Sequence, residues 1–112
     1  MIVDDMPTVG RALARVLGKH FDETHVRQTA AEAESLLSEK AVTHVICDYC
    51  LGGGDPLGVD LLPRWRREHP AIERALLITG YDENAIAAGP EINAVVSKLA
   101  SYDELATLLN RR

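Results

Sequence analysis

The chain has 112 residues, of which 46% are hydrophobic and 26% charged, and its formal net charge is -5. This length allows one domain with a hydrophobic core and is too short for two ordinary domains, so we expect a single domain over residues 1–112. The acidic balance argues against nucleic-acid binding, which needs clustered Lys and Arg, and no apolar run approaches the ~18 residues of a membrane-spanning helix. The start, MIVDD, lacks the basic and apolar regions of a secretory signal, and we therefore expect a cytoplasmic protein.

Short β-branched runs alternate with helical patterns along the whole chain. In chain order, strands are predicted at residues 1–4, 24–27, 43–48, 74–79 and 93–98, and helices at 8–19, from 29, from 59 to about 69, at 83–88 and from 101. Thr29 with Glu32, and Ser101 with Glu104, have the spacing of a capping box, which marks the start of a helix. Pro63 fits the third helix as a first-turn residue, because amides of the first turn lack an intrahelical partner.

The order of these elements predicts the fold class. Strands that lack apolar/polar alternation and are each followed by a helix indicate a parallel sheet covered on both faces, with right-handed crossovers. We therefore predict an α/β fold, a doubly wound five-stranded parallel sheet built from five βα units. In such sheets the functional site lies outside the carboxyl ends of the strands, near the switch in strand order.

Polar residues stand at the carboxyl ends of four of the five predicted strands. Asp4 and Asp5 end the first strand, Asp48 the third, Thr79 the fourth and Lys98 the fifth. Crowded carboxylates need a cation to offset their repulsion, and a few hard oxygen ligands suit Mg²⁺. Asp48 is also a candidate nucleophile that would form an acyl phosphate, with Lys98 and the Thr79 hydroxyl contacting the phosphoryl oxygens.

The motifs VDD, VICDY, LLITG and VVSK, spread over essentially the whole chain, resemble those of the receiver domain of two-component response regulators. The resemblance implies a flavodoxin-like (βα)5 fold with strand order 2-1-3-4-5. It also implies that Asp48 is phosphorylated by a histidine kinase or a phosphotransfer protein. Thr79 matches the switch hydroxyl of the family, and Lys98 matches its lysine.

The resemblance further implies a metal site and a set of partners. In the family the position of Asp5 binds Mg²⁺ directly, that of Asp4 assists through water, and the backbone carbonyl at the position of Cys50 joins Asp48 as a ligand. Such a receiver is not an enzyme in the usual sense, because it catalyses only its own phosphorylation and dephosphorylation. Phosphorylation would change binding to an output domain or protein at the face of the fourth helix, fifth strand and fifth helix, which is also a candidate homodimer surface.

Several features depart from the family pattern. Leu99 stands where receivers usually have a proline, and Val95 stands where they usually have an aromatic switch residue. The segment between Thr79 and Lys98 is short, which predicts a reduced fourth helix. These departures support an alternative function, a receiver-like interaction module that works independently of phosphorylation. The first predicted strand is also short, and we expect further residues before Met1.

Cys47 and Cys50 enclose Asp48 in a C-x-x-C, which raises the alternative of a redox or zinc pair. A thioredoxin-type pair needs a helix at the second cysteine, which LGGG does not begin, and a zinc site needs a second matching pair of Cys or His. We interpret Cys47 as a buried hydrophobe and Cys50 as a rim residue that controls, with Tyr81, water access to the acyl phosphate.

A further alternative function is a Mg²⁺-dependent phosphohydrolase that uses Asp48 as its nucleophile. An enzyme of that class would need an acidic residue at the position where this chain has Cys50.

Overall fold

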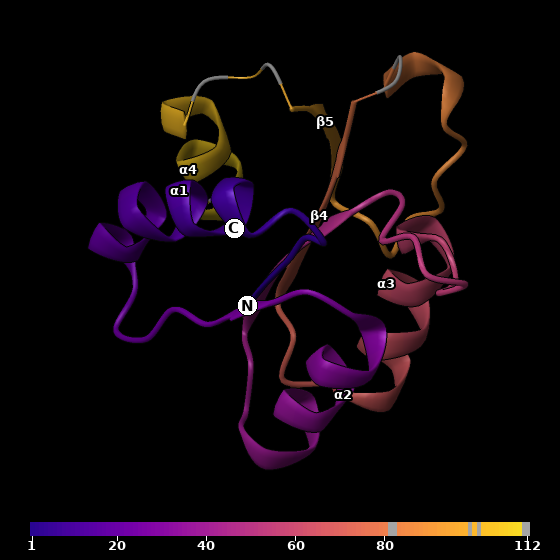
Figure 1. The fold of residues 1–112 in the computed structure, drawn as a ribbon, viewed down its shortest axis with the longest axis horizontal. Coiled ribbons are helices and arrows are strands. Elements are labelled where there is room, and N and C mark those ends of the chain that lie inside the picture. The colour runs from indigo at the N-terminus through magenta and orange to yellow at the C-terminus, as the bar shows by residue number, and fades with distance from the viewer. Residues whose placement is uncertain (81–82, 99, 101, 111–112) are drawn as a thin grey trace.

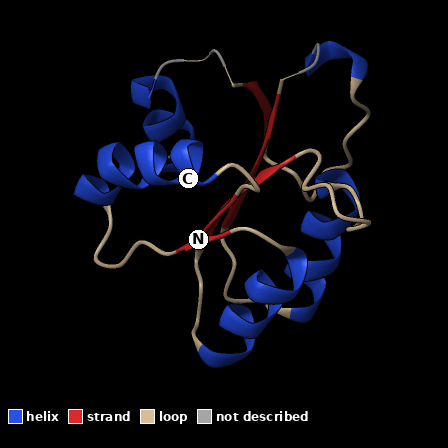
Figure 2. Cartoon of the chain, viewed as in Figure 1, coloured by secondary structure: helices blue, strands red, loops and turns tan. Residues whose placement is uncertain are grey.

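The computed structural model describes residues 1–80, 83–98, 100 and 102–110, which form one five-stranded parallel sheet with helices on both sides (Figures 1 and 2). The strands are β1 Ile2–Val3, β2 Val26–Arg27, β3 His44–Asp48, β4 Arg74–Thr79 and β5 Ala94–Ser97. The helices are α1 Pro7–Leu17, α2 Ala30–Glu39, α3 Gly58–Glu68 and α4 Tyr102–Asn110, with 3₁₀ turns η1 Gly18–His20 and η2 Glu83–Ala85. The strand order is β2-β1-β3-β4-β5, which confirms the predicted flavodoxin-like topology.

The sheet separates two layers of helices and two hydrophobic clusters. Helices α1 and α4 cover one face, and α2 and α3 cover the other (Figure 1). Side chains of β3 alternate between the clusters, since Val45 and Cys47 pack toward α2 and α3 whereas Ile46 packs toward α1 and α4. Both β3 and β4 are buried along nearly their whole length, as expected for the central strands of a covered parallel sheet.

Local sequence accounts for the starts of the first two helices. Pro7 is the first residue of α1, where its fixed φ suits a helix and its missing amide costs nothing. At α2, the Thr29 hydroxyl accepts a hydrogen bond from the Glu32 amide at 3.1 Å, as the capping-box spacing predicts. The Glu32 carboxylate in turn accepts from the Gln28 amide at 3.0 Å.

The third and fourth helices differ from their predictions. Helix α3 begins at Gly58, so Pro63 lies in its interior rather than in its first turn and removes an amide donor there. The helix predicted at residues 83–88 is reduced to the single 3₁₀ turn η2. Between residue 83 and the helix-ending Gly89–Pro90 pair the chain is too short to repay the cost of helix nucleation. The helix of the fifth βα unit is therefore α4, and its predicted cap Ser101 lies outside the described residues.

The described part of the chain contains no helix that is both long and apolar enough to cross a membrane.

Candidate functional site

The parallel register of the sheet brings the predicted site residues to one edge. Val3 pairs with Cys47, which sets Asp4 beside the end of β3, where Asp48 is the last residue. Asp48 pairs with Ile78, and Thr79 pairs with Ser97, so that Lys98 follows directly. The Lys98 amide donates to the Thr79 carbonyl at 2.8 Å and continues the ladder past the end of β5. The strand ends therefore converge as the sequence predicts.

Three carboxylates form the centre of the site. One oxygen from each of Asp4, Asp5 and Asp48 lies within 4.8 Å of the other two. Asp4 and Asp48 are buried, whereas Asp5 is exposed, so the cluster is open to solvent on one side. Because like charges at this separation repel one another, the arrangement favours the arrival of a cation.

Lys98 supplies one positive charge to the cluster. Its Nζ donates to Asp48 Oδ2 at 2.9 Å and lies 3.6 Å from Asp4 Oδ2. Partial burial lowers the pKa of Lys98, but the hydrogen bond to Asp48 and the charges of the three carboxylates outweigh it and leave the pKa raised. Lys98 therefore stays protonated at neutral pH and holds Asp48 in place.

The contacts of Asp4 show that Lys98 alone does not supply a hydrogen-bond donor to every buried carboxylate oxygen of the cluster. Its Oδ1 accepts from the Met6 amide at 2.9 Å, but among the described residues no group donates a hydrogen bond to its buried Oδ2. Burial raises the pKa of Asp4, and the charges of Asp48 and Asp5 raise it further against the opposing effects of the Met6 amide and Lys98. A buried carboxylate oxygen without a donor, beside two more carboxylates, fits a divalent cation with oxygen ligands.

The segment between β3 and α3, residues 49–57, forms a loop beside the carboxylates. Its ends are held by the Tyr49 amide, which donates to the Ile78 carbonyl, and by the Gly58 amide, which donates to the Tyr49 carbonyl, both at 2.8 Å. Cys50 is exposed in this loop, as predicted for a rim residue. A Cβ built on Gly52 would lie 3.6 Å from Asp5 Oδ2, so the loop borders the carboxylate cluster.

Gly58 is a site residue that the sequence reading missed. A Cβ at this position would lie 2.4 Å from the Asp48 carbonyl oxygen and 2.7 Å from a methyl group of Leu77. Only glycine allows the start of α3 to pack this closely against the end of β3. The available signal was a glycine at the start of a helical pattern, close after the glycine-rich loop.

Three further predicted positions are buried or half-buried. Thr79 is fully buried at the end of β4, and Val95 is half-buried on the α2 and α3 side of the sheet. Cys47 is buried and, like Cys50, is a free thiol; burial and then the nearby carboxylates, Asp48 first, raise its pKa, so its thiol stays protonated and unreactive. Tyr81 and Leu99 lie outside the described residues.

Solved structures similar to this chain are known. No protein-family model matches the chain, and no curated protein does either. The chain is similar to the signal receiver domain of an HD domain-containing protein from Pseudomonas fluorescens, with 30% identity and a TM-score of 0.79 over 96% of this chain and 87% of that one.

Two further structures have the same fold at lower sequence identity. One is a response regulator from Burkholderia pseudomallei with a phosphorylated aspartic acid, a calcium ion and citrate, at 23% identity and a TM-score of 0.83; the match covers 97% of this chain but only 64% of that one. The other is the N-terminal domain of a response regulator/sensory box/GGDEF 3-domain protein from Carboxydothermus hydrogenoformans, at 21% identity and a TM-score of 0.76, covering 96% and 86% of the two chains.

Proposed function

The chain belongs to the receiver domain family of response regulators, and on that premise we propose that Asp48 accepts a phosphoryl group from a phosphohistidine of a partner histidine kinase or phosphotransfer protein. One observation carries the proposal. The Asp48 carboxylate ends a buried strand, with Lys98 Nζ at 2.9 Å and two more carboxylates close by. This set of groups suits a nucleophile that must receive a group carrying several negative oxygens.

The transfer forms one bond and breaks one bond. A carboxylate oxygen of Asp48 attacks phosphorus as the phosphorus–nitrogen bond to the donor imidazole breaks, and the imidazole nitrogen keeps that electron pair. The product is an acyl phosphate on Asp48. Lys98, already beside Asp48 Oδ2, neutralises a phosphoryl oxygen, and the Thr79 hydroxyl donates a hydrogen bond to another. Catalysis is confined to the domain's own phosphorylation and dephosphorylation.

The residues that would hold Mg²⁺ are the carboxylates of Asp4, Asp5 and Asp48 and the backbone carbonyl of Cys50. When bound, the ion supplies positive charge that offsets both the carboxylate repulsion and the charge of the phosphoryl oxygens. The donorless Oδ2 of Asp4 and the close spacing of the three carboxylates support this assignment. The Burkholderia neighbour, whose description names both a phosphorylated aspartic acid and a calcium ion, is consistent with it.

Partners follow from the same proposal. The neighbour from Pseudomonas belongs to an HD domain-containing protein, and the neighbour from Carboxydothermus belongs to a three-domain protein. We propose that this domain also acts on an output domain or protein. The proposed contact surface is the face of η2, β5 and α4, which is also the candidate surface for a homodimer.

The test is intact mass after incubation with acetyl phosphate and Mg²⁺, on the native chain and on Asp48→Asn, with and without EDTA. We expect a gain of one phosphoryl group, about 80 Da, in the native chain only and only with metal. Lys98 keeps a polar partner in the asparagine variant, so loss of labelling there reports loss of the nucleophile rather than unfolding. Equal labelling of Asp48→Asn, or labelling that survives EDTA, would contradict the assignment.

A second candidate is a binding module of this family that works without phosphorylation. Two observations favour it: the fourth helix of the fold is reduced to the turn η2, and Val95 is a small, half-buried side chain where an aromatic switch residue is usual. The two functions differ in one measurable respect. Only the first requires that a phosphoryl group on Asp48 alters the structure at β5.

A further inference from the structure

The loop of residues 49–57, which carries the Cys50 carbonyl, is anchored at Tyr49 and at the buried Leu51, but its glycine run has little rigidity of its own. Gly52, Gly53 and Gly54 are consecutive and have φ values of 74°, 60° and 83°. Glycine adopts these left-handed angles freely and many others as well, so three in succession leave the backbone poorly determined. A loop that must present a carbonyl to a metal needs an external support, because displacement by even 1 Å weakens such a site.

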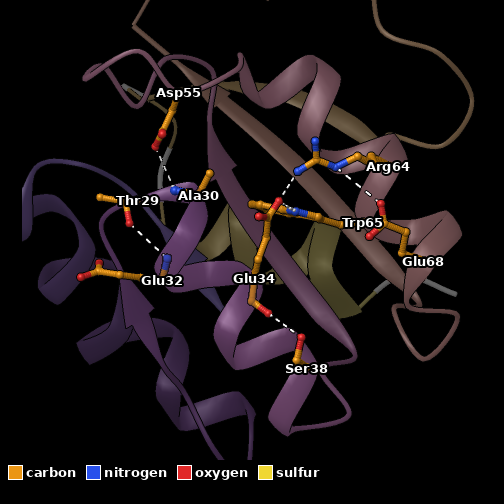
Figure 3. A network of polar contacts seen from close by, with 9 residues as sticks. All are labelled: Thr29, Ala30, Glu32, Glu34, Ser38, Asp55, Arg64, Trp65 and Glu68. Carbon is orange, nitrogen blue, oxygen red and sulfur yellow. Dashed lines mark hydrogen bonds and ion pairs between the residues drawn. The ribbon is translucent and has the colours of Figure 1, made fainter.

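Asp55 provides a support from outside the loop. Its Oδ2 accepts a hydrogen bond from the Ala30 amide at 2.9 Å, which joins the loop to the first residue of α2 (Figure 3). Its own amide donates to the Gly52 carbonyl at 3.0 Å and closes a turn around the glycines. The positive end of the α2 dipole further favours a carboxylate at this place.

The Asp55 contact is not needed to start α2, because that helix has its own capping box. Thr29 and Glu32 already satisfy the amides of Glu32 and Gln28. Helix α2 is in turn held against α3, since Glu34 accepts a hydrogen bond from the Trp65 indole at 3.0 Å and pairs with Arg64 (Figure 3). The helix is therefore a fixed body to which the glycine loop is attached.

We infer that Asp55 is a positioning residue for the phosphoryl-acceptor site: it holds the glycine loop against α2 and so keeps this loop, which borders Asp5 at Gly52, beside the carboxylate cluster. The inference rests on the proposed function, because it concerns the loop that would contribute a Mg²⁺ ligand. It extends that function by connecting the site to α2. Because coupling between two sites is reciprocal, Mg²⁺ binding would also tighten the contact between Asp55 and the Ala30 amide.

A pair of matched variants tests this role. Asp55→Ala and Thr29→Ala each remove one oxygen that accepts a hydrogen bond from an amide in the first turn of α2, but only Asp55→Ala releases the loop. Titration with MgCl₂ by calorimetry should show Mg²⁺ binding roughly 10-fold weaker in Asp55→Ala, the usual effect of removing a supporting contact, and unchanged in Thr29→Ala. Asp55→Asn keeps an acceptor oxygen and should restore most of the affinity.

Hydrogen exchange without metal supplies an independent readout. The amides of residues 51–54 should exchange faster in Asp55→Ala than in the native chain or in Thr29→Ala. Unchanged exchange, or Mg²⁺ affinity that falls equally in both alanine variants, would overturn the inference and leave Asp55 as a helix cap. Failure of the proposed metal site looks different: the native chain itself would bind no Mg²⁺, while the exchange measurement would still report on the tether.

Discussion

Asp4 lowers the stability of the fold at the pH at which the site would work. Its pKa is raised by burial and by the charges of Asp48 and Asp5. A carboxyl whose pKa is higher in the folded state stabilises the fold below its unfolded pKa of 3.8, and this contribution is lost as the pH rises through the folded value. At neutral pH the charged Asp4 side chain therefore reduces the free energy of unfolding, as is common for functional groups.

Replacing Asp4 by asparagine should therefore stabilise the metal-free protein. At pH 7 without divalent ions we expect Asp4→Asn to raise the free energy of unfolding by about 1 kcal/mol, because the acceptor for the Met6 amide remains and one buried charge is removed. The gain should shrink toward pH 4, because the native carboxyl takes up its proton as the pH falls through its raised pKa. Urea unfolding, followed by the fluorescence of the single tryptophan, Trp65, measures both effects.

The control for this prediction is Asp22→Asn, which removes an exposed carboxylate far along the sequence from the cluster. Its effect on stability should be small at both pH values. Addition of Mg²⁺ should stabilise the native chain and Asp22→Asn by mass action, and Asp4→Asn much less. An Asp4→Asn variant that is less stable than the native chain at pH 7 would show that the carboxylate is satisfied in the fold.

Among the elements, α3 begins in close contact with the end of β3. Gly58 brings α3 against the end of β3, where an added Cβ would overlap the Asp48 carbonyl oxygen and Leu77. We expect Gly58→Ala to cost about 2 kcal/mol of stability through overpacking, and to slow labelling by acetyl phosphate because Asp48 must shift. Urea unfolding and the time course of the mass gain measure the two effects.

Gly89→Ala is the matched control for Gly58→Ala. No described atom lies within 4 Å of the Cβ position at Gly89, and its φ is not positive. Both substitutions add the same methyl group, so loss of backbone freedom in the unfolded chain is common to both. If Gly58→Ala labels and unfolds like Gly89→Ala, the close approach of α3 to Asp48 does not control the geometry of the acceptor.

The elements also show how far the sequence predicts the fold. The central strands β3 and β4 match their predictions closely, because buried apolar runs of this length, bounded by polar residues, have few alternatives. Edge strand β2 is two residues shorter than predicted, since its extent depends on pairing with β1. The prediction of a helix at residues 83–88 is wrong because nearby glycine and proline leave too few residues for its turns, whereas the predicted reduction of the fourth helix is confirmed. These errors concern boundaries and one short element, whereas the order of elements was correct.

The candidate site also combines features that the sequence predicts with features that it does not. Residue types at strand ends predicted which groups meet, because parallel strands place their carboxyl ends at one edge. The contacts of Gly58 and Asp55 could not be predicted from local sequence. The Asp55 carboxylate reaches Ala30, 25 residues earlier, and the closeness of Gly58 to Asp48 depends on how α3 packs. Such roles become visible only when tertiary structure brings distant segments together.

At the scale of the whole molecule, β5 connects the site to the opposite end of the sheet. Lys98, just after β5, is paired with Asp48. At the other end of β5, the Asn93 backbone amide donates a hydrogen bond to the Ala75 carbonyl, and the Asn93 side-chain oxygen accepts one from Arg66. Arg66 on α3 also donates to the Glu91 carbonyl. The start of β5 is therefore anchored to α3 and β4, and its end is held by an ion pair that a phosphoryl group would rearrange.

This arrangement predicts where phosphorylation changes the molecule. With saturating acetyl phosphate and Mg²⁺, amide hydrogen exchange should change at the end of β5, around Ser97 and Lys98, and in α4, and stay unchanged near Asn93. The reason is that Lys98 must leave Asp48 Oδ2 to meet the phosphoryl oxygens, while the contacts of Asn93 are untouched. Asp48→Asn under the same conditions supplies the baseline. Changes confined to the loop of residues 49–57 in a fully phosphorylated sample would instead identify an interaction module whose binding surface does not depend on phosphorylation.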